Sequence, residues 1–201
     1  MAADQTTEWP QFKLVTYAAP TGIPHGWDAE LLEQGAPDGL GCTALPALIL
    51  LTHPDIGPLV CFGLGHLVDL YVCMNPHTKQ VVDIHAHGPI ASDDTQPEMI
   101  GPALPVNSSL GQFIASVRAV TERFPYDSEV TGKGRRDEED EETRDERRFN
   151  EWSEAVLQMA DMLDRIDPTA YTLGGDYWGI FLGDVSMGNY ASETWRNPPD
   201  A

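Results

Sequence analysis

Runs of apolar and β-branched residues separated by turn residues dominate the first half of the chain. The runs lie at 59–64, 67–74 and 80–86, and the turn-forming pair Asn75 and Pro76 separates the last two. Apolar residues line at least one face of each run, as expected for strands that lie on a hydrophobic core. The pattern predicts an antiparallel meander of neighbouring strands, around which the rest of the fold is built.

A helical period follows the meander. Asn107, Ser108 and Ser109 carry short polar side chains that can accept the first unpaired N–H groups of a helix. Apolar residues then recur at i, i+3, i+4 and i+7 until Pro125 stops the helix, which we expect at 107–124. This helix should cover one face of the meander.

Two further helices are expected towards the C-terminus. Apolar residues at helical spacing begin at Phe149 and continue to Ile166, where Asp167 and Pro168 stop the helix. The glycine-rich and aromatic segment that follows predicts a short helix at 176–186, packed back on the body of the protein.

Proline and glycine interrupt the remaining segments, so the apolar pattern of these segments predicts secondary structure less directly. The apolar run at 43–51 suits a buried strand, but Pro46 removes a ladder hydrogen bond, which leaves strand and loop both open. The other predictions are an edge strand at 11–17, a short helix at 27–34 capped by Asp28 and ended by Gly35, a turn at 36–39 and an irregular crossover at 88–106.

The charge balance narrows the possible partners. The formal net charge is −20, from 12 basic and 32 acidic residues. Residues 133–148 hold half of the basic residues and are close to neutral, so the rest of the chain is strongly acidic. Such a surface repels nucleic acid and anionic membranes and attracts basic proteins. We therefore expect no nucleic-acid and no membrane partner; the acidity either attracts a basic protein or serves solubility alone.

Length and composition favour one globular domain. With 201 residues, 41% of them hydrophobic, the chain can bury a sizeable core. We expect a single domain over 1–201, with a charged insertion at 129–148 that is either a mobile loop or a solvated helix start, and a loose tail at 196–201. No secretion signal is visible, and the longest apolar run, within 44–51, is too short to span a membrane. These observations predict a cytoplasmic protein.

No motif in the chain specifies catalysis. Gly63 and Gly65 begin like a dinucleotide-binding fingerprint, but Val68 replaces its third glycine and a strand follows, so we interpret them as turn glycines. Helix capping accounts for Ser108 and Ser109, which do not lie in a nucleophile elbow. We therefore expect no catalytic residues, no cofactor and no enzymatic activity.

A metal site is the one chemical alternative that the spacing leaves open. In a strand, His85 and His87 would share a face with Asp83, as metal ligands could. Nothing in the sequence singles out a further ligand or a second shell, so solvent-facing histidines at a strand end are the simpler interpretation. No metal is expected.

The cysteines are interpreted as reduced thiols. Cys42, Cys61 and Cys73 are odd in number, lie in apolar surroundings and form no C-x-x-C pair. We expect them to be buried and to act as small hydrophobic residues.

The helix start Asn107-Ser108-Ser109-Leu110 is the most distinctive of several short motifs that point to one family. The others are Gly35-Ala36-Pro37, Phe62-Gly63-Leu64-Gly65, Leu70-Tyr71-Val72, Val81-Val82-Asp83-Ile84, Asp167-Pro168 and Tyr177-Trp178-Gly179-Ile180, with Gly188. In these residues, over about 31–190, the chain resembles the SUKH superfamily, in particular its fourth group of bacterial immunity proteins. It departs from that pattern at Ala36, where a larger apolar residue is usual, in the hairpin turn, where glycine is usual, and in the charged insertion.

The resemblance implies an α+β fold in which a mixed, mostly antiparallel sheet is flanked by helices in a single domain. It also implies a non-enzymatic immunity protein that binds and neutralises a bacterial toxin, such as a nuclease or a deaminase acting on nucleic acid. An acidic protein could fill the basic groove of such a toxin as a phosphate mimic, with association accelerated by electrostatic steering. A basic toxin domain is therefore the expected partner.

The expected contact residues are carboxylates in exposed loops near the rim of the sheet, with one aromatic anchor. They are Asp55, Asp93, Asp94 and Glu98, with Trp27 as the anchor. Two alternatives of other classes stay open: a structural or regulatory protein-interaction module, which other members of the superfamily resemble, and a metal-dependent hydrolase using His85 and His87.

Overall fold

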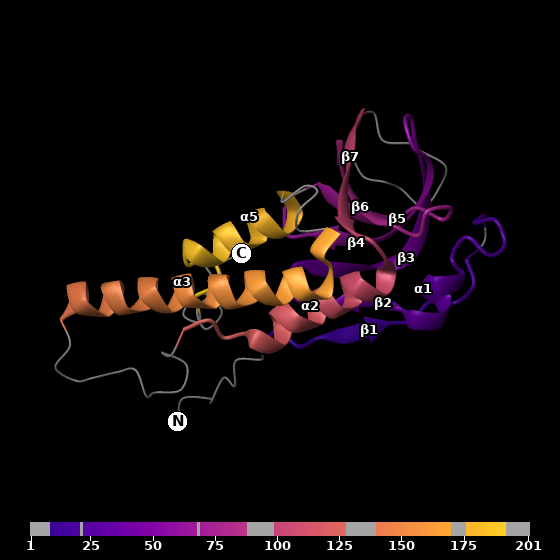
Figure 1. Ribbon diagram of the computed structural model, residues 1–201. Helices are drawn as coiled ribbons and strands as arrows, with labels where there is room; N and C mark the ends of the chain where they lie inside the picture. Colours follow the sequence, from indigo (N-terminus) through magenta and orange to yellow (C-terminus); the bar gives the residue numbers. More distant parts are fainter. Residues whose placement is uncertain are drawn as a thin grey trace, which may run out of the picture.

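Antiparallel strands and the helices packed along one of their faces form the body of the protein (Figure 1). The structure, a computed structural model, describes residues 9–20, 22–67, 69–87, 99–127, 140–169 and 176–191. Its strands are β1 (Lys13–Val15), β2 (Ala36–Asp38), β3 (Cys42–His53), β4 (Gly57–Gly65), β5 (Leu70–Met74), β6 (Val81–His87) and β7 (Met99–Asn107). Its helices are α1 (Ala29–Gln34), α2 (Leu110–Arg123), α3 (Glu141–Ile166) and α5 (Asp176–Ser186).

In the described part of the chain, five strands form one sheet in the order β3-β4-β5-β6-β7, and each neighbouring pair is antiparallel. The meander expected from the sequence is confirmed as β4, β5 and β6. The sheet contains one further strand on each side of it, β3 and β7. A separate two-stranded ribbon pairs β1 with β2. With its flanking helices, this arrangement is the predicted α+β single domain.

The side chain of Asn75 shapes the turn between β5 and β6. Its Oδ1 accepts the backbone N–H groups of His77, at 2.9 Å, and Thr78, at 3.1 Å. Lys79 adopts a positive φ of 65° in this turn. The hydrogen bonds accepted by the side chain of one asparagine therefore hold this hairpin turn.

Both edge strands of the sheet contain proline, and this explains one wrong prediction. Pro46 lies within a register shift between β3 and β4, and Pro102 and Pro105 lie in β7. Because an edge strand has one row of unpaired groups, a residue without an N–H group is tolerated there. The crossover predicted at 88–106 is therefore wrong where β7 forms, and residues 88–98 lie outside the described residues.

The turn predicted at 36–39 is also wrong, because its first three residues form β2. Pro37 pairs with Leu14 in the two-stranded ribbon, where it again occupies an edge. Lys13 and Asp38 form an ion pair of 2.8 Å across the same ribbon. The strand predicted at 11–17 is confirmed in its central residues, which form β1.

Helices α2, α3 and α5 form the layer that covers one face of the sheet (Figure 1). Ser109 caps α2, as predicted, because its hydroxyl accepts the N–H of Gln112 at 3.3 Å. On the inner side of α2, the ring of Phe113 packs against Phe62 of β4 and against Trp178 of α5, with centroids 5.8 Å and 6.0 Å apart. These contacts lie in the main hydrophobic core.

The charged stretch before the third helix is, where described, the start of that helix. Asp140 caps α3 by accepting the N–H of Thr143 at 2.8 Å, and the helix runs on for 26 residues. In Figure 1 its first turns project beyond α2 and α5. The solvated helix start expected within 129–148 is thus confirmed from 140 onwards, and 129–139 lie outside the described residues.

The opposite face of the sheet carries a second, smaller hydrophobic cluster. Leu51, Leu59 and Ile84 are fully buried in it. His53, at the end of β3, donates from Nε2 to the carbonyl oxygen of Gly101 in β7 at 2.9 Å, and its Nδ1 accepts the N–H of Asp55 at 3.1 Å. Because β3 and β7 are the two edges of the sheet, this bond shows that the sheet curls around the second cluster.

We expect His53→Ala to lower the free energy of unfolding by about 2 kcal/mol, measured by urea denaturation. The ring is buried, and its loss removes two hydrogen bonds and leaves a cavity where the edges of the sheet meet. His85→Ala, on the exposed side of β6, is the matched control and should change stability by no more than about 0.5 kcal/mol. Equal effects of the two substitutions would show that the bond to Gly101 does not hold the sheet closed.

The prediction of reduced thiols is wrong for two of the three cysteines. Cys61 and Cys73 form a disulfide between β4 and β5, where the strand register makes them direct partners with Cα atoms 3.9 Å apart. Their separation in the sequence did not show this pairing, because it depends on the register of the hairpin. Cys42 is free and buried, as expected, and burial raises the pKa of its thiol.

Candidate partner-binding surface

The predicted anchor Trp27 lies just before α1, where it is only partly exposed. Its ring packs against the main core and contacts the ring of His77 edge-on, with centroids 5.5 Å apart. An ion pair of 3.8 Å between Lys79 and Glu30 joins the same turn to α1. Trp27 therefore helps to hold α1 against the sheet, and part of its surface stays available for contact.

The predicted loop carboxylates are only partly covered by the structure. Asp55 is exposed in the turn between β3 and β4, where its backbone N–H donates to His53. Asp93, Asp94 and Glu98 lie outside the described residues. Of these four carboxylates, the structure therefore places Asp55 alone.

The most distinctive sequence motif proves to be part of a buried polar network. Asp167, only 1% exposed, accepts hydrogen bonds from Asn107 Nδ2 at 3.1 Å, from the N–H of Ser108 at 2.6 Å and from the Ser108 hydroxyl at 2.9 Å. Asn107 Oδ1 in turn accepts the indole N–H of Trp178 at 3.1 Å. The network ties the end of β7 and the start of α2 to the end of α3 and to α5. Its role is structural, since Asn107 and Asp167, which form its centre, are each only 1% exposed.

The candidate metal ligands differ in exposure, and the glycine pair has a structural role. His85 is exposed whereas Asp83 is buried. Within the described residues no group of three or more metal-ligating side chains comes together. Gly63 and Gly65 lie in β4 and not in a turn.

The reason for these glycines is close packing. A Cβ atom at Gly63 would lie 2.6 Å from the sulfur of Cys42, and one at Gly65 would lie 2.6 Å from the side chain of Leu70. Both positions therefore need glycine for a close approach of neighbouring side chains.

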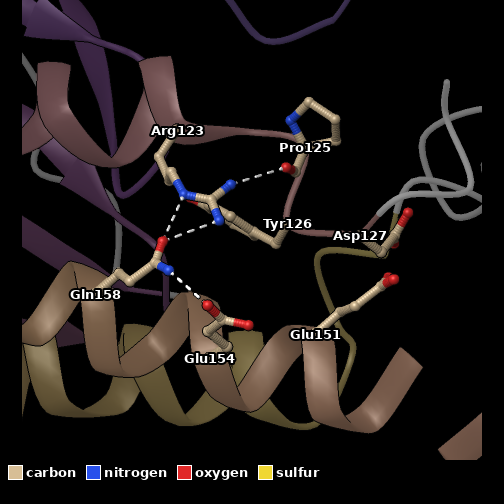
Figure 2. Close-up of a pocket in the computed structure, with 7 residues that line it drawn as sticks. All are labelled: Arg123, Pro125, Tyr126, Asp127, Glu151, Glu154 and Gln158. Atoms are coloured by element: carbon tan, nitrogen blue, oxygen red, sulfur yellow. Dashed lines mark hydrogen bonds between the residues drawn. The ribbon is translucent and has the colours of Figure 1, made fainter. Parts of the chain in front are cut away.

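A concave cleft with acidic side chains in its lining lies between the end of α2 and the middle of α3 (Figure 2). It encloses about 290 Å³. The side chains that line it include the carboxylates Asp127, Glu151 and Glu154, and Glu151 points towards Asp127 in Figure 2. Asp127 accepts the indole N–H of Trp152 at 3.4 Å, so the structure fixes its position.

The single arginine in the lining of this cleft is held to one side by neutral groups. Arg123 donates to Gln158 Oε1 at 3.2 Å and 3.4 Å and to the carbonyl oxygen of Pro125 at 3.3 Å (Figure 2). Gln158 donates in turn to Glu154 at 3.0 Å. Glu151 forms an ion pair with Arg147 at 3.2 Å. Glu154 is exposed beside the cavity, whose lining arginine is held by neutral acceptors.

The phenol of Tyr126, which lines the cleft, is held by the protein backbone. The hydroxyl of Tyr126 donates to the carbonyl oxygen of Val120 at 2.7 Å. Burial raises the pKa of Tyr126 well above its usual value, so the phenol stays neutral. The remaining polar groups are carboxylates and an amide, which suit basic side chains of a protein partner.

Next to the cleft, the outer face of α3 combines acidic and apolar side chains. Leu157 is 71% exposed and Phe149 59% exposed, and Glu154 and Asp161 are exposed on the same helix. The inward-facing position predicted for Phe149 is therefore wrong. Arg148 occupies the buried stripe instead, because its guanidinium stacks over the ring of Trp152, 5.1 Å from the centroid.

A partly buried histidine between β4 and α5 predicts a pH effect on stability. His66 packs edge-on against Tyr177, with centroids 5.0 Å apart, and against Phe181. Burial lowers the pKa of His66, and the charge of Asp184 opposes this shift. A lowered pKa means that the folded protein binds the proton less readily than the unfolded chain does. Stability is thus intact above the usual histidine pKa of about 6.5 and falls as the pH drops below it.

We therefore expect the free energy of unfolding to decrease between about pH 7 and pH 5, and His66→Phe to reduce that slope. Phenylalanine keeps a ring against Tyr177 and Phe181 but cannot take up a proton. Urea denaturation of both proteins across this range measures the effect. Identical slopes would show that His66 remains equally easy to protonate in the folded state.

Comparison with known proteins gives one match. A model described as SUKH-4 immunity protein matches residues 5–184. No curated protein and no solved structure matches the chain. In the described residues, no helix is both long enough and apolar enough to cross a membrane.

Proposed function

The chain belongs to the SUKH-4 immunity protein family, and we propose that it binds a cognate bacterial toxin in the cytoplasm and neutralises it through an acidic surface. The proposed surface consists of the cleft between α2 and α3 together with the exposed face of α3. The partner is a basic toxin domain, a nuclease or a deaminase acting on nucleic acid. The protein acts by occupying the site of the toxin and not by catalysis.

The observation that carries this proposal is the concave cleft with three carboxylates. A basic side chain of a toxin can enter such a cleft and form a charge-assisted hydrogen bond with the exposed Glu154, and it would compete with Arg147 for Glu151. The exposed Leu157 on the next turn of α3 provides an apolar contact of the kind found at the centre of protein interfaces.

The overall charge supports the same partner class. A net charge of −20 accelerates association with a positively charged protein and disfavours competing acidic partners. A toxin that acts on nucleic acid has a basic groove for phosphates, and carboxylates can take the place of those phosphates. Occupation of the groove then excludes the nucleic acid sterically and electrostatically.

The residues expected from the sequence form a second proposed contact region. Trp27 and Asp55, and with them Asp93, Asp94 and Glu98, are proposed as additional contacts outside the cleft. Of these residues, the two that the structure describes, Trp27 and Asp55, do not line the cleft.

Co-expression tests the function directly. The toxin encoded next to this chain is expressed in a susceptible host with or without the protein, and survival is counted. We expect the host to survive only when this protein is present. We also expect the protein and the toxin to purify together as a complex. Cell death in both cases, with no complex formed by any toxin of the same locus, contradicts the proposal.

A further inference from the structure

A second cavity lies at the other end of the helical layer, between the segment that precedes α1 and α1 itself. It encloses about 330 Å³. Ile23, Ala29 and Leu32 provide apolar walls, Asp28 provides a carboxylate, and His25 also lines the cavity. The cleft described above shares no residue with this cavity.

Asp28 lines this cavity and makes no side-chain interaction among the described residues. The residue is 7% exposed and occupies the cap position of α1, but its side chain makes no capping hydrogen bond. Only its backbone carbonyl is used, as the acceptor of the Leu32 N–H at 2.9 Å. Among the described residues the carboxylate has no hydrogen bond and no ion pair. The side chain is therefore available to a ligand that enters the cavity.

The composition of the cavity selects one kind of ligand. Apolar walls around a single carboxylate match a side chain that has an aliphatic stem and a positively charged end. Arginine matches best, because its guanidinium can donate two parallel hydrogen bonds to one carboxylate. An anion would be repelled by Asp28, and a fully apolar group would leave the carboxylate uncompensated.

We propose that this cavity binds an arginine side chain of a basic protein partner, with the guanidinium on Asp28 and the stem against Ile23 and Leu32. The net charge of −20 favours a basic partner. The assignment of that partner as the toxin rests on the proposed function, whereas recognition of the arginine rests on the cavity alone. Trp27, which lies beside Asp28 and is partly exposed, would border the bound segment.

NMR titration with N-acetyl-arginine methylamide tests the cavity without the toxin. Saturable shifts of the methyl groups of Ile23 and Leu32 are expected, whereas the citrulline derivative, which has the same shape but no charge, should cause none. Asp28→Asn should weaken binding by at least about tenfold, the effect of losing a charge-assisted pair. Asparagine is as good a helix cap as aspartate, so the variant keeps its fold.

Glu33→Gln is the matched control, since Glu33 is exposed on the same helix and does not line the cavity. It should bind the arginine derivative like the unchanged protein. The proposal is overturned if the shifts do not saturate, if citrulline binds equally well, or if Asp28→Asn has no effect. Arginine binding without neutralisation of any toxin would instead contradict the proposed function and leave the cavity assignment standing.

Discussion

Replacing Asp167 by alanine should lower the free energy of unfolding by about 3 to 4 kcal/mol. The carboxylate is almost fully buried and accepts three hydrogen bonds from Asn107 and Ser108. Its removal would leave these donors without an acceptor in a site that excludes water, and would loosen Asn107, which holds Trp178 of α5. Urea denaturation measures the change.

Asp164→Ala is the matched control for this substitution. Asp164 lies on the same last turns of α3 but is exposed, so its loss should change stability by no more than about 0.5 kcal/mol. Asp167→Asn, which keeps one acceptor oxygen, should fall between the two. A loss no larger for Asp167→Ala than for Asp164→Ala would show that the network does not hold α2, α3 and α5 together.

Reversing one charge in the cleft, Glu154→Lys, should weaken toxin binding by about 10- to 100-fold. Glu154 is exposed on α3 and lysine favours helix, so the substitution should preserve the fold. In the complex it would place a positive charge opposite the basic groove of the toxin, and most of the loss should appear at low ionic strength. Isothermal titration calorimetry measures the affinity.

Glu33→Lys makes the same change in net charge at an exposed position of α1, away from the cleft. We expect it to alter affinity by less than about threefold, because a distant exposed charge is largely screened. If both variants lose affinity equally, total charge and not the cleft determines binding.

Elements with a local signal could be predicted from the sequence. The helix at 176–186 and the cap at Ser109 need only the spacing of apolar residues and a short polar side chain, and both are confirmed. The spacing of apolar residues gave a wrong result at the start of α3. It placed Phe149 on the inward-facing side, whereas Arg148 is buried there with its long side chain stacked on Trp152.

Features that depend on tertiary pairing could not be predicted. β7 lies in a proline-rich stretch, and its pairing with β6 at the edge of the sheet decides its structure. The cleft needs α2 and α3 to pack side by side, so Glu151 and Glu154 looked like ordinary polar-face residues in the sequence. The motif at Asn107 and Ser108 was recognised, but its partner Asp167, some 60 positions away, emerged only from the fold.

The most direct test of the central claim is a calorimetric titration of the neighbouring toxin with this protein over a series of NaCl concentrations. Our account predicts a saturable complex whose dissociation constant rises steeply as salt is increased, because carboxylates of the acidic surface contact basic side chains of the toxin. The absence of a complex, or an affinity that does not change with salt, would contradict it.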